Sequence, residues 1–140
     1  RTVPLRAHVG PACLALRRES LEQVGLLDEA YFMYTEEMDL CYRLLQAGWE
    51  NYWLPQARVT HYGEASSRQA AETMFVALYR SKVQFQRKYF GEREARRFKR
   101  LLYLAYTPRA ALMTVAAVAA PRLASRARTY RHLLRELPTL

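Results

Sequence analysis

Residues 31–43, Tyr-Phe-Met-Tyr-Thr-Glu-Glu-Met-Asp-Leu-Cys-Tyr-Arg, bring three carboxylates into four positions, directly after a run of large aromatic and apolar side chains. Thr35 stands where a helix N-cap is expected, because its hydroxyl can accept a hydrogen bond from a free N–H of the first turn. Glu36 and Glu37 then fall in that turn, where the helix dipole favours negative charge. The stretch therefore predicts a helix with an acidic first turn.

The rest of the stretch predicts how this helix is paired and where it ends. Asp39 and Arg43 are four residues apart, so they can form an ion pair along one helix face. We expect that pair to be partly exposed and to contribute about 0.3–1 kcal/mol. The buried side of the helix is expected to contain Leu40, Leu44 and Leu45. The helix is expected to stop at Gly48. On spacing alone, a structural helix with an acidic turn competes with a catalytic one.

Motifs on both sides of this helix add information through their order. They are Arg17-Arg18, Val24-Gly25, Asp28-Glu29, Phe32, Tyr34, Glu36-Glu37, Asp39-Leu40, Arg43, Gly48-Trp49, Pro55, His61, Gly63 and Ser66. In this order they resemble the second half of the catalytic domain of family-2 inverting glycosyltransferases, especially the rhamnosyltransferase-like bacterial branch. The resemblance covers about residues 9–67.

The resemblance implies an α/β fold. Residues 1–67 would be the C-terminal, acceptor-side half of a GT-A (Rossmann-like) glycosyltransferase domain with a few short strands, and residues 68–140 an all-helical basic tail. The nucleotide-binding half of the family, with its metal-binding Asp-x-Asp, would lie upstream. The only aspartates here are Asp28 and Asp39, and neither forms that motif. We therefore expect a C-terminal fragment that is inactive alone.

The resemblance also assigns catalytic roles. In an inverting transfer, the acceptor hydroxyl loses a proton as it attacks the anomeric carbon, and a positioned carboxylate is a suitable base. The family places this base at the second acidic residue of a Glu-Asp pair, which is Glu37 here, so Glu stands in place of Asp. Glu36 would be a supporting carboxylate. Further substrate-binding positions are Gly10, Asp39, Arg43 and Trp49, although Trp49 also suits core packing.

Cofactor and partners follow from the same resemblance. The donor would be a nucleotide sugar, dTDP-rhamnose by resemblance, and the acceptor a lipid-linked or cell-envelope glycan. A divalent metal, Mn²⁺ or Mg²⁺, would neutralise the departing diphosphate, with His61 as a ligand. Without the family context, a histidine after a strand is more often a hydrogen-bonded structural residue.

Charge divides the chain into two different parts. Residues 1–67 hold six basic and nine acidic residues, a net charge of −3, whereas residues 68–140 hold sixteen and four, a net charge of +12. Residues 122–137 combine apolar residues at helical spacing with arginines, which predicts binding to an anionic membrane surface. The alternative is that this helix packs back on the missing catalytic half, with the arginines as a solvated face. We expect a cytoplasmic protein, peripheral on the inner face of the plasma membrane.

A second function class competes with the enzyme. The basic tail alone would suit a non-enzymatic helical module that binds anionic membrane or nucleic acid. No helix-turn-helix, RNP or zinc-finger spacing is present, so no nucleic acid partner is expected. Such a module would also leave the ordered motifs of residues 9–67 unexplained.

Local patterns give further expectations. A buried strand is predicted at 12–16, a short helix at 19–24 closed by Gly25, and strands at 50–54 and 57–62. A helix should run from Ser66 or Ser67 to about Phe90 and stop at Gly91. Pro108 should break the next helix, which leaves an apolar run at 110–120 that is too short to span a bilayer. Cys13 and Cys41 are expected to be buried free thiols.

Overall fold

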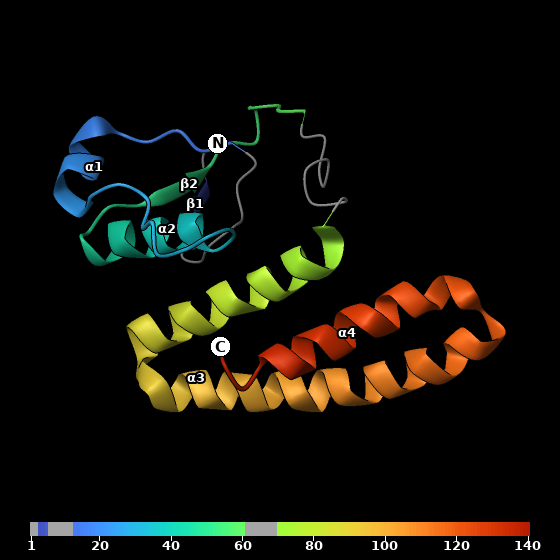
Figure 1. The fold of residues 1–140 in the computed structure, drawn as a ribbon. Coiled ribbons are helices and arrows are strands. Elements are labelled where there is room, and N and C mark those ends of the chain that lie inside the picture. Colours follow the sequence, from blue (N-terminus) through green and yellow to red (C-terminus); the bar gives the residue numbers. More distant parts are fainter. Residues whose placement is uncertain (1–2, 6–12, 61–69) are drawn as a thin grey trace. The chain divides into compact units, whose positions relative to one another are not determined.

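A computed structural model describes residues 3–5, 13–60 and 70–140 (Figure 1). The chain forms two compact units, Arg1–Ala65 and Ser66–Leu140. The predicted boundary between residues 67 and 68 lies outside the described residues. Most of the described chain is helical, and its strands are short. The elements are β1 (Val3–Leu5), α1 (Arg18–Val24), α2 (Glu36–Gln46), β2 (Asn51–Trp53), α3 (Ala71–Ala119), the 3-10 helix η2 (Pro121–Leu123) and α4 (Ala124–Glu136).

The first unit pairs two helices with a small antiparallel sheet. β1 and β2 pair in the register Val3–Trp53, so the strand predicted at 50–54 is confirmed and gains a partner that the sequence did not reveal. The helix predicted at 19–24 is confirmed as α1, and Gly25 follows it with a φ of 82°.

Two strand predictions in this unit were wrong over their described parts. Residues 13–16 are exposed and form no strand, and neither do residues 57–60. Both segments have strand-like composition, but within the described chain neither has a neighbouring strand to pair with. Cys13 is correspondingly exposed, against prediction, whereas Cys41 is buried on α2 as predicted.

Helix α2 follows the predicted pattern closely. It begins at Glu36, and Leu40 and Leu44 on its buried side are only 1% and 4% exposed. Leu45 is half-buried. The chain then leaves the helix through Gly48, whose φ of 85° lies in the left-handed region that glycine adopts without a steric cost. The N–H of Trp49 donates back to the carbonyl of Leu44 at 2.9 Å, which closes the last turn.

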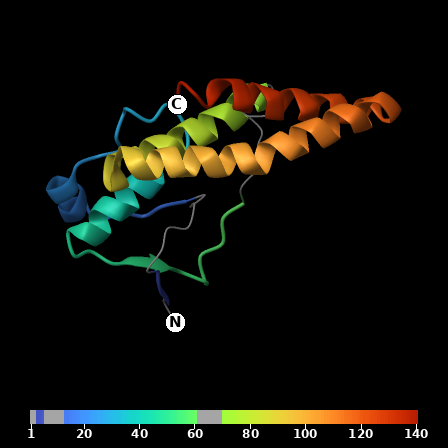
Figure 2. The same cartoon turned by 90° about the horizontal axis from the view of Figure 1, so that it is seen from below.

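The second unit is a bundle of three helical segments. Gly91, with φ 82° and ψ 172°, interrupts the helical backbone of α3 at the predicted stop, and the helix resumes directly after it. The two parts of α3 therefore fold back on each other, and α4 packs along them (Figures 1 and 2). The core of this bundle contains Val76, Val83, Ala95, Leu102, Leu133, Leu137 and Leu140.

Pro108 does not break α3, which corrects the prediction. Proline has a φ compatible with a helix and removes one hydrogen bond, here the one to the carbonyl of Leu104. Leu104 is 74% exposed, so this turn of the helix lies at the surface of the bundle. The helix continues to Ala119 and ends just before Pro121. By length and composition α3 could cross a membrane, contrary to the expectation from the run at 110–120.

The apolar stripe of the predicted basic helix is used inside the bundle. Ala127, Leu133 and Leu137 are at most 1% exposed. The arginines of α4 lie on its exposed side. There Nε of Arg128 lies 3.2 Å from Oε1 of Glu72 on α3. The stripe is therefore covered by α3 of the same unit, a partner other than the missing catalytic half that the sequence analysis considered.

This packing yields the first prediction. Leu133→Ala should destabilise the second unit by about 2–5 kcal/mol, because it leaves a cavity in a fully buried site. Leu104→Ala, at an exposed position of the same bundle, should change the unfolding free energy in solution by less than about 0.5 kcal/mol. Helical circular dichroism during urea unfolding measures both. Equal effects of the two substitutions would contradict the bundle.

Candidate active site around helix α2

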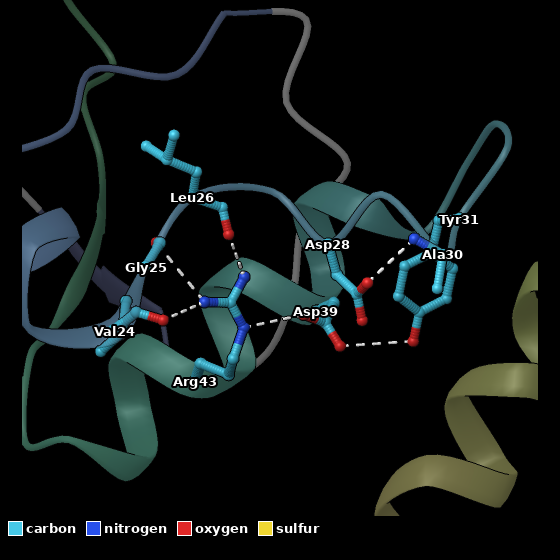
Figure 3. Close-up of polar contacts among 8 residues, drawn as sticks. All are labelled: Val24, Gly25, Leu26, Asp28, Ala30, Tyr31, Asp39 and Arg43. Carbon is cyan, nitrogen blue, oxygen red and sulfur yellow. Dashed lines mark hydrogen bonds and ion pairs between the residues drawn. The ribbon is translucent and has the colours of Figure 1, made fainter.

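Arg43 joins the two helices of the first unit (Figure 3). Its Nε donates to Oδ2 of Asp39 at 2.8 Å, within α2. Its Nη1 donates to the carbonyl of Val24, and its Nη2 donates to the carbonyl of Leu26 at 2.6 Å. The guanidinium therefore connects α2 with the end of α1 and the loop that follows it. A planar group with five N–H donors suits this task better than a lysine would.

Asp39 is the buried counter-charge of this arginine. Its side chain is 0% exposed, while that of Arg43 is 20% exposed. The hydroxyl of Tyr31 donates to the other carboxylate oxygen, Oδ1, at 3.3 Å. The predicted pairing of Asp39 with Arg43 is confirmed, but the prediction that the pair is partly exposed was wrong for the carboxylate. Both oxygens of Asp39 are engaged in holding the structure.

The carbonyls that Arg43 contacts lie at the C-terminal end of α1. A helix C-terminus presents unpaired carbonyl oxygens and a partial negative charge, which a cation stabilises. The last turn of α1 carries no basic side chain of its own, so Arg43 supplies this charge from α2. Gly25 adds a 3.4 Å contact through its own carbonyl oxygen.

The acidic turn begins after an unusual backbone. Tyr34 and Thr35 have φ values of 67° and 75°, although neither is glycine. Such residues are uncommon in the left-handed region, and each costs of order 1–3 kcal/mol. Nothing in the sequence marks Tyr34 for this conformation. Thr35 does precede the helix as predicted, but its hydroxyl makes no capping hydrogen bond, so that part of the prediction was wrong.

Glu36 and Glu37 follow directly, both half-buried in the first turn of α2. Oε2 of Glu36 is buried and has no hydrogen-bond partner within the described chain. Glu37 lies one turn before Cys41, and its negative charge adds to burial in raising the pKa of that thiol. The turn therefore presents two carboxylates that the ion pair of Asp39 and Arg43 does not use.

The other predicted site residues are placed as follows. Trp49 is half-buried, and its Nε1 donates to Oε1 of Gln23 on α1 at 2.8 Å, so it too links α1 with α2. Gly10 and His61 lie outside the described residues. A shallow surface hollow lies along α1 and is lined by Leu16, Arg18, Leu21, Glu22 and Leu26. Neither glutamate of the acidic turn lines it.

The resemblance to family-2 glycosyltransferases implies a divalent metal, for which the described carboxylates are candidate ligands. Within residues 13–60 and 70–140, no three His, Cys, Asp or Glu side chains gather closely enough to hold a metal ion. Asp39 is already paired with Arg43. The described residues therefore do not form a metal site by themselves.

The family model described as glycosyltransferase like family 2 matches residues 4–80, more than half of the chain. The chain belongs to this family. Membership confirms the resemblance seen in the motif order and indicates a GT-A fold for the matched part. It also places the acidic turn and the buried ion pair inside a glycosyltransferase domain.

Curated relatives agree with this membership. The chain is 40% identical over 70 residues to the N-acetylglucosaminyl-diphospho-decaprenol L-rhamnosyltransferase of Mycobacterium tuberculosis (strain H37Rv). These aligned residues are 50% of this chain and 23% of that protein. It is 34% identical over 55 residues to Rhamnosyltransferase WbbL of Escherichia coli (strain K12), or 39% of this chain and 21% of that protein. The Low-salt glycan biosynthesis hexosyltransferase Agl10 of Haloferax volcanii is 29% identical over 84 residues, or 60% and 26%.

These matches span about a quarter of the length of each of those relatives. No solved structure matches the chain.

The burial of the ion pair yields the second prediction. Asp39→Asn should destabilise the first unit by about 3–5 kcal/mol, because it leaves Arg43 without its buried counter-charge. The two tryptophans of the chain, Trp49 and Trp53, both lie in this unit, so their fluorescence during urea unfolding reports on it alone. Glu22→Gln, at an exposed position of α1, is the control and should cost less than about 0.5 kcal/mol. A cost below about 1 kcal/mol for Asp39→Asn would mean that the pair is solvated.

Proposed function

We propose that this chain is the acceptor-side part of an inverting glycosyltransferase that uses a nucleotide-sugar donor, with rhamnose as the sugar. The acceptor would be a lipid-linked or cell-envelope glycan. Support comes from membership of glycosyltransferase family 2 and from two relatives named as rhamnosyltransferases, one of them for a diphospho-decaprenol substrate. The nucleotide-binding part would be supplied by residues outside this chain.

Glu37 is the proposed general base. The acceptor hydroxyl oxygen forms a bond to the anomeric carbon of the donor as the bond from that carbon to the nucleoside diphosphate breaks. The hydroxyl proton passes to the Glu37 carboxylate, and the diphosphate leaves with the bonding electrons. The attack comes from the face opposite the leaving group, which inverts the configuration. Such a base typically contributes about 10²–10⁴-fold to the rate.

The three carboxylates in the first turns of α2 have different surroundings, and these favour Glu37 as the base. Asp39 accepts hydrogen bonds from Arg43 and Tyr31 through both of its oxygens, so it holds the fold and is poorly placed to take a proton. Successive residues of an α-helix are rotated by about 100°, which puts Glu37 on a different side of α2 from Asp39. Glu36 lies nearer the Asp39 side, and its Oε2 is buried without a hydrogen-bond partner within the described chain.

A divalent metal with His61 among its ligands remains a proposal, as does a contact of Gly10 with substrate. A metal would neutralise the leaving diphosphate when bound. Trp49 and Arg43 are proposed to act on substrate through the loop and helix that they hold, since their side chains contact Gln23, Asp39 and backbone carbonyls.

We also propose that the protein is cytoplasmic and peripheral on the inner face of the plasma membrane. The support is the net charge of +12 on residues 68–140 and the exposed arginines of residues 122–137, which would meet anionic headgroups. A purely non-enzymatic basic module would share these features. Such a module would not explain the family match over residues 4–80.

The third prediction tests the base in the complete protein to which these residues belong. Glu37→Gln keeps the size and hydrogen bonding of the side chain but cannot accept the proton. The kcat for rhamnose transfer from dTDP-rhamnose to a polyprenyl-diphospho-N-acetylglucosamine should fall by about 10²-fold or more, with the donor KM little changed. Glu37→Asp restores the usual residue of the family and should stay active.

The controls separate catalysis from folding. Glu22→Gln removes an exposed carboxylate of the same unit and should leave kcat unchanged. Asp39→Asn should lower the melting temperature, with activity following the folded fraction. Normal turnover by Glu37→Gln, together with a folded but inactive Asp39→Asn, would show that Glu37 is the wrong carboxylate for the general base.

A further inference from the structure

The second half of α3 carries an exposed aliphatic face. Its members are between 61% and 87% exposed, namely Leu101, Leu104, Leu112, Val115 and Val118. They are spaced by three residues or by eight, so they lie along one side of the helix. An 18-residue stretch of α3 is apolar enough to span a membrane, and only 11% of that stretch is buried in the structure. We call these five residues the aliphatic face.

Charge is arranged around this face and not on it. Arg97 and Arg100 precede it, and Arg122 and Arg126 follow it, all at exposed positions. The one charged residue between Leu101 and Ala119 is Arg109. Its guanidinium lies 5.9 Å from the ring centre of Tyr106, a side chain that packs against the bundle core. Arg109 is itself exposed, and this contact turns its side chain toward Tyr106.

The packing of α4 argues against a transmembrane orientation. α4 lies along α3 in the same bundle (Figure 2), so a spanning α3 would carry the arginines of α4 into the hydrocarbon. Charged side chains at that depth are strongly unfavourable. An in-plane orientation avoids this cost. A helix in the interface buries its apolar side at the boundary of headgroups and acyl chains and keeps its charges at headgroup level.

The composition of the face favours lipid over a second protein surface. Its side chains are leucine and valine, without the aromatic anchors that are enriched at the centres of protein interfaces. Two copies of the chain that met through this face would bring their flanking arginines together, and like charges repel. Anionic headgroups complement those same arginines.

We propose that the aliphatic face of α3 inserts into the interfacial region of an anionic phospholipid bilayer, with the helix parallel to the membrane plane. The inference rests on the proposed membrane association and changes which element enters the lipid. The apolar stripe of α4 is buried against α3, so α4 contributes charge while α3 contributes the inserted surface. The proposed insertion of the aliphatic face does not depend on the chemistry proposed for Glu37.

The fourth prediction tests this surface with the 140-residue chain and phosphatidylcholine vesicles that contain or lack phosphatidylglycerol. Leu104→Gln with Leu112→Gln should weaken binding to the anionic vesicles by about tenfold or more, because two inserted side chains become polar. The matched control is Leu26→Gln with Leu27→Gln, two leucines of the first unit that are 74% and 51% exposed. It should change the affinity by less than about twofold. Circular dichroism checks that each variant is folded.

A second variant separates insertion from electrostatic docking. Arg122→Gln with Arg126→Gln should reduce the salt dependence of binding and the preference for phosphatidylglycerol. If this variant binds weakly while the Leu104 and Leu112 variant binds like the wild type, docking by charge survives and insertion is overturned. If the wild-type chain binds no vesicles, both ideas fail. Self-association that is lost in the leucine variant, with vesicle binding unchanged, would make the face a protein contact and overturn the inference.

Discussion

The buried ion pair between Asp39 and Arg43 is the interaction on which the first unit depends. Asp39 is fully buried, so its charge is tolerated only because Arg43 and Tyr31 satisfy it. Arg43 in turn ties α2 to the carbonyls at the end of α1 and to the loop after it. Few apolar contacts could replace this link, because α1 is short and mostly exposed. The contacts of Arg43 with the carbonyls of Val24 and Leu26 also restrict the rotation of α2 about its own axis.

That rotation decides what the neighbouring carboxylates can do. With Asp39 turned into the structure, Glu37 lies on another side of α2, and the left-handed backbone of Tyr34 and Thr35 sets where the turn begins. Strained backbone of this kind persists only where the surroundings hold it in place, and it is found preferentially at functional sites. One helix turn thus combines a structural carboxylate with two glutamates that the ion pair of Asp39 and Arg43 does not use, inside the part of the chain that matches glycosyltransferase family 2.

Local sequence patterns predicted the parts of this fold that depend on neighbours in the chain. The four-residue spacing of Asp39 and Arg43, the glycine after α2 and the glycine within α3 all had the predicted effect. The failures depend on tertiary context. The full burial of Asp39 and the continuation of α3 through Pro108 both depend on surroundings that local spacing does not show. Residues 13–16 lack a partner strand in the described chain. The site residues were found through the family motif, because spacing alone left the structural reading of the acidic helix open.

The dependence of transfer on pH tests the central claim most directly, namely that Glu37 takes the acceptor proton while Asp39 serves the structure. In the complete protein, kcat should fall as the pH is lowered, because a protonated base cannot accept the proton. The residual activity of Glu37→Gln should lose this acidic limb, whereas folded Asp39→Asn should keep it. An unchanged acidic limb in Glu37→Gln, or its loss in folded Asp39→Asn, would contradict the division of roles between these two carboxylates.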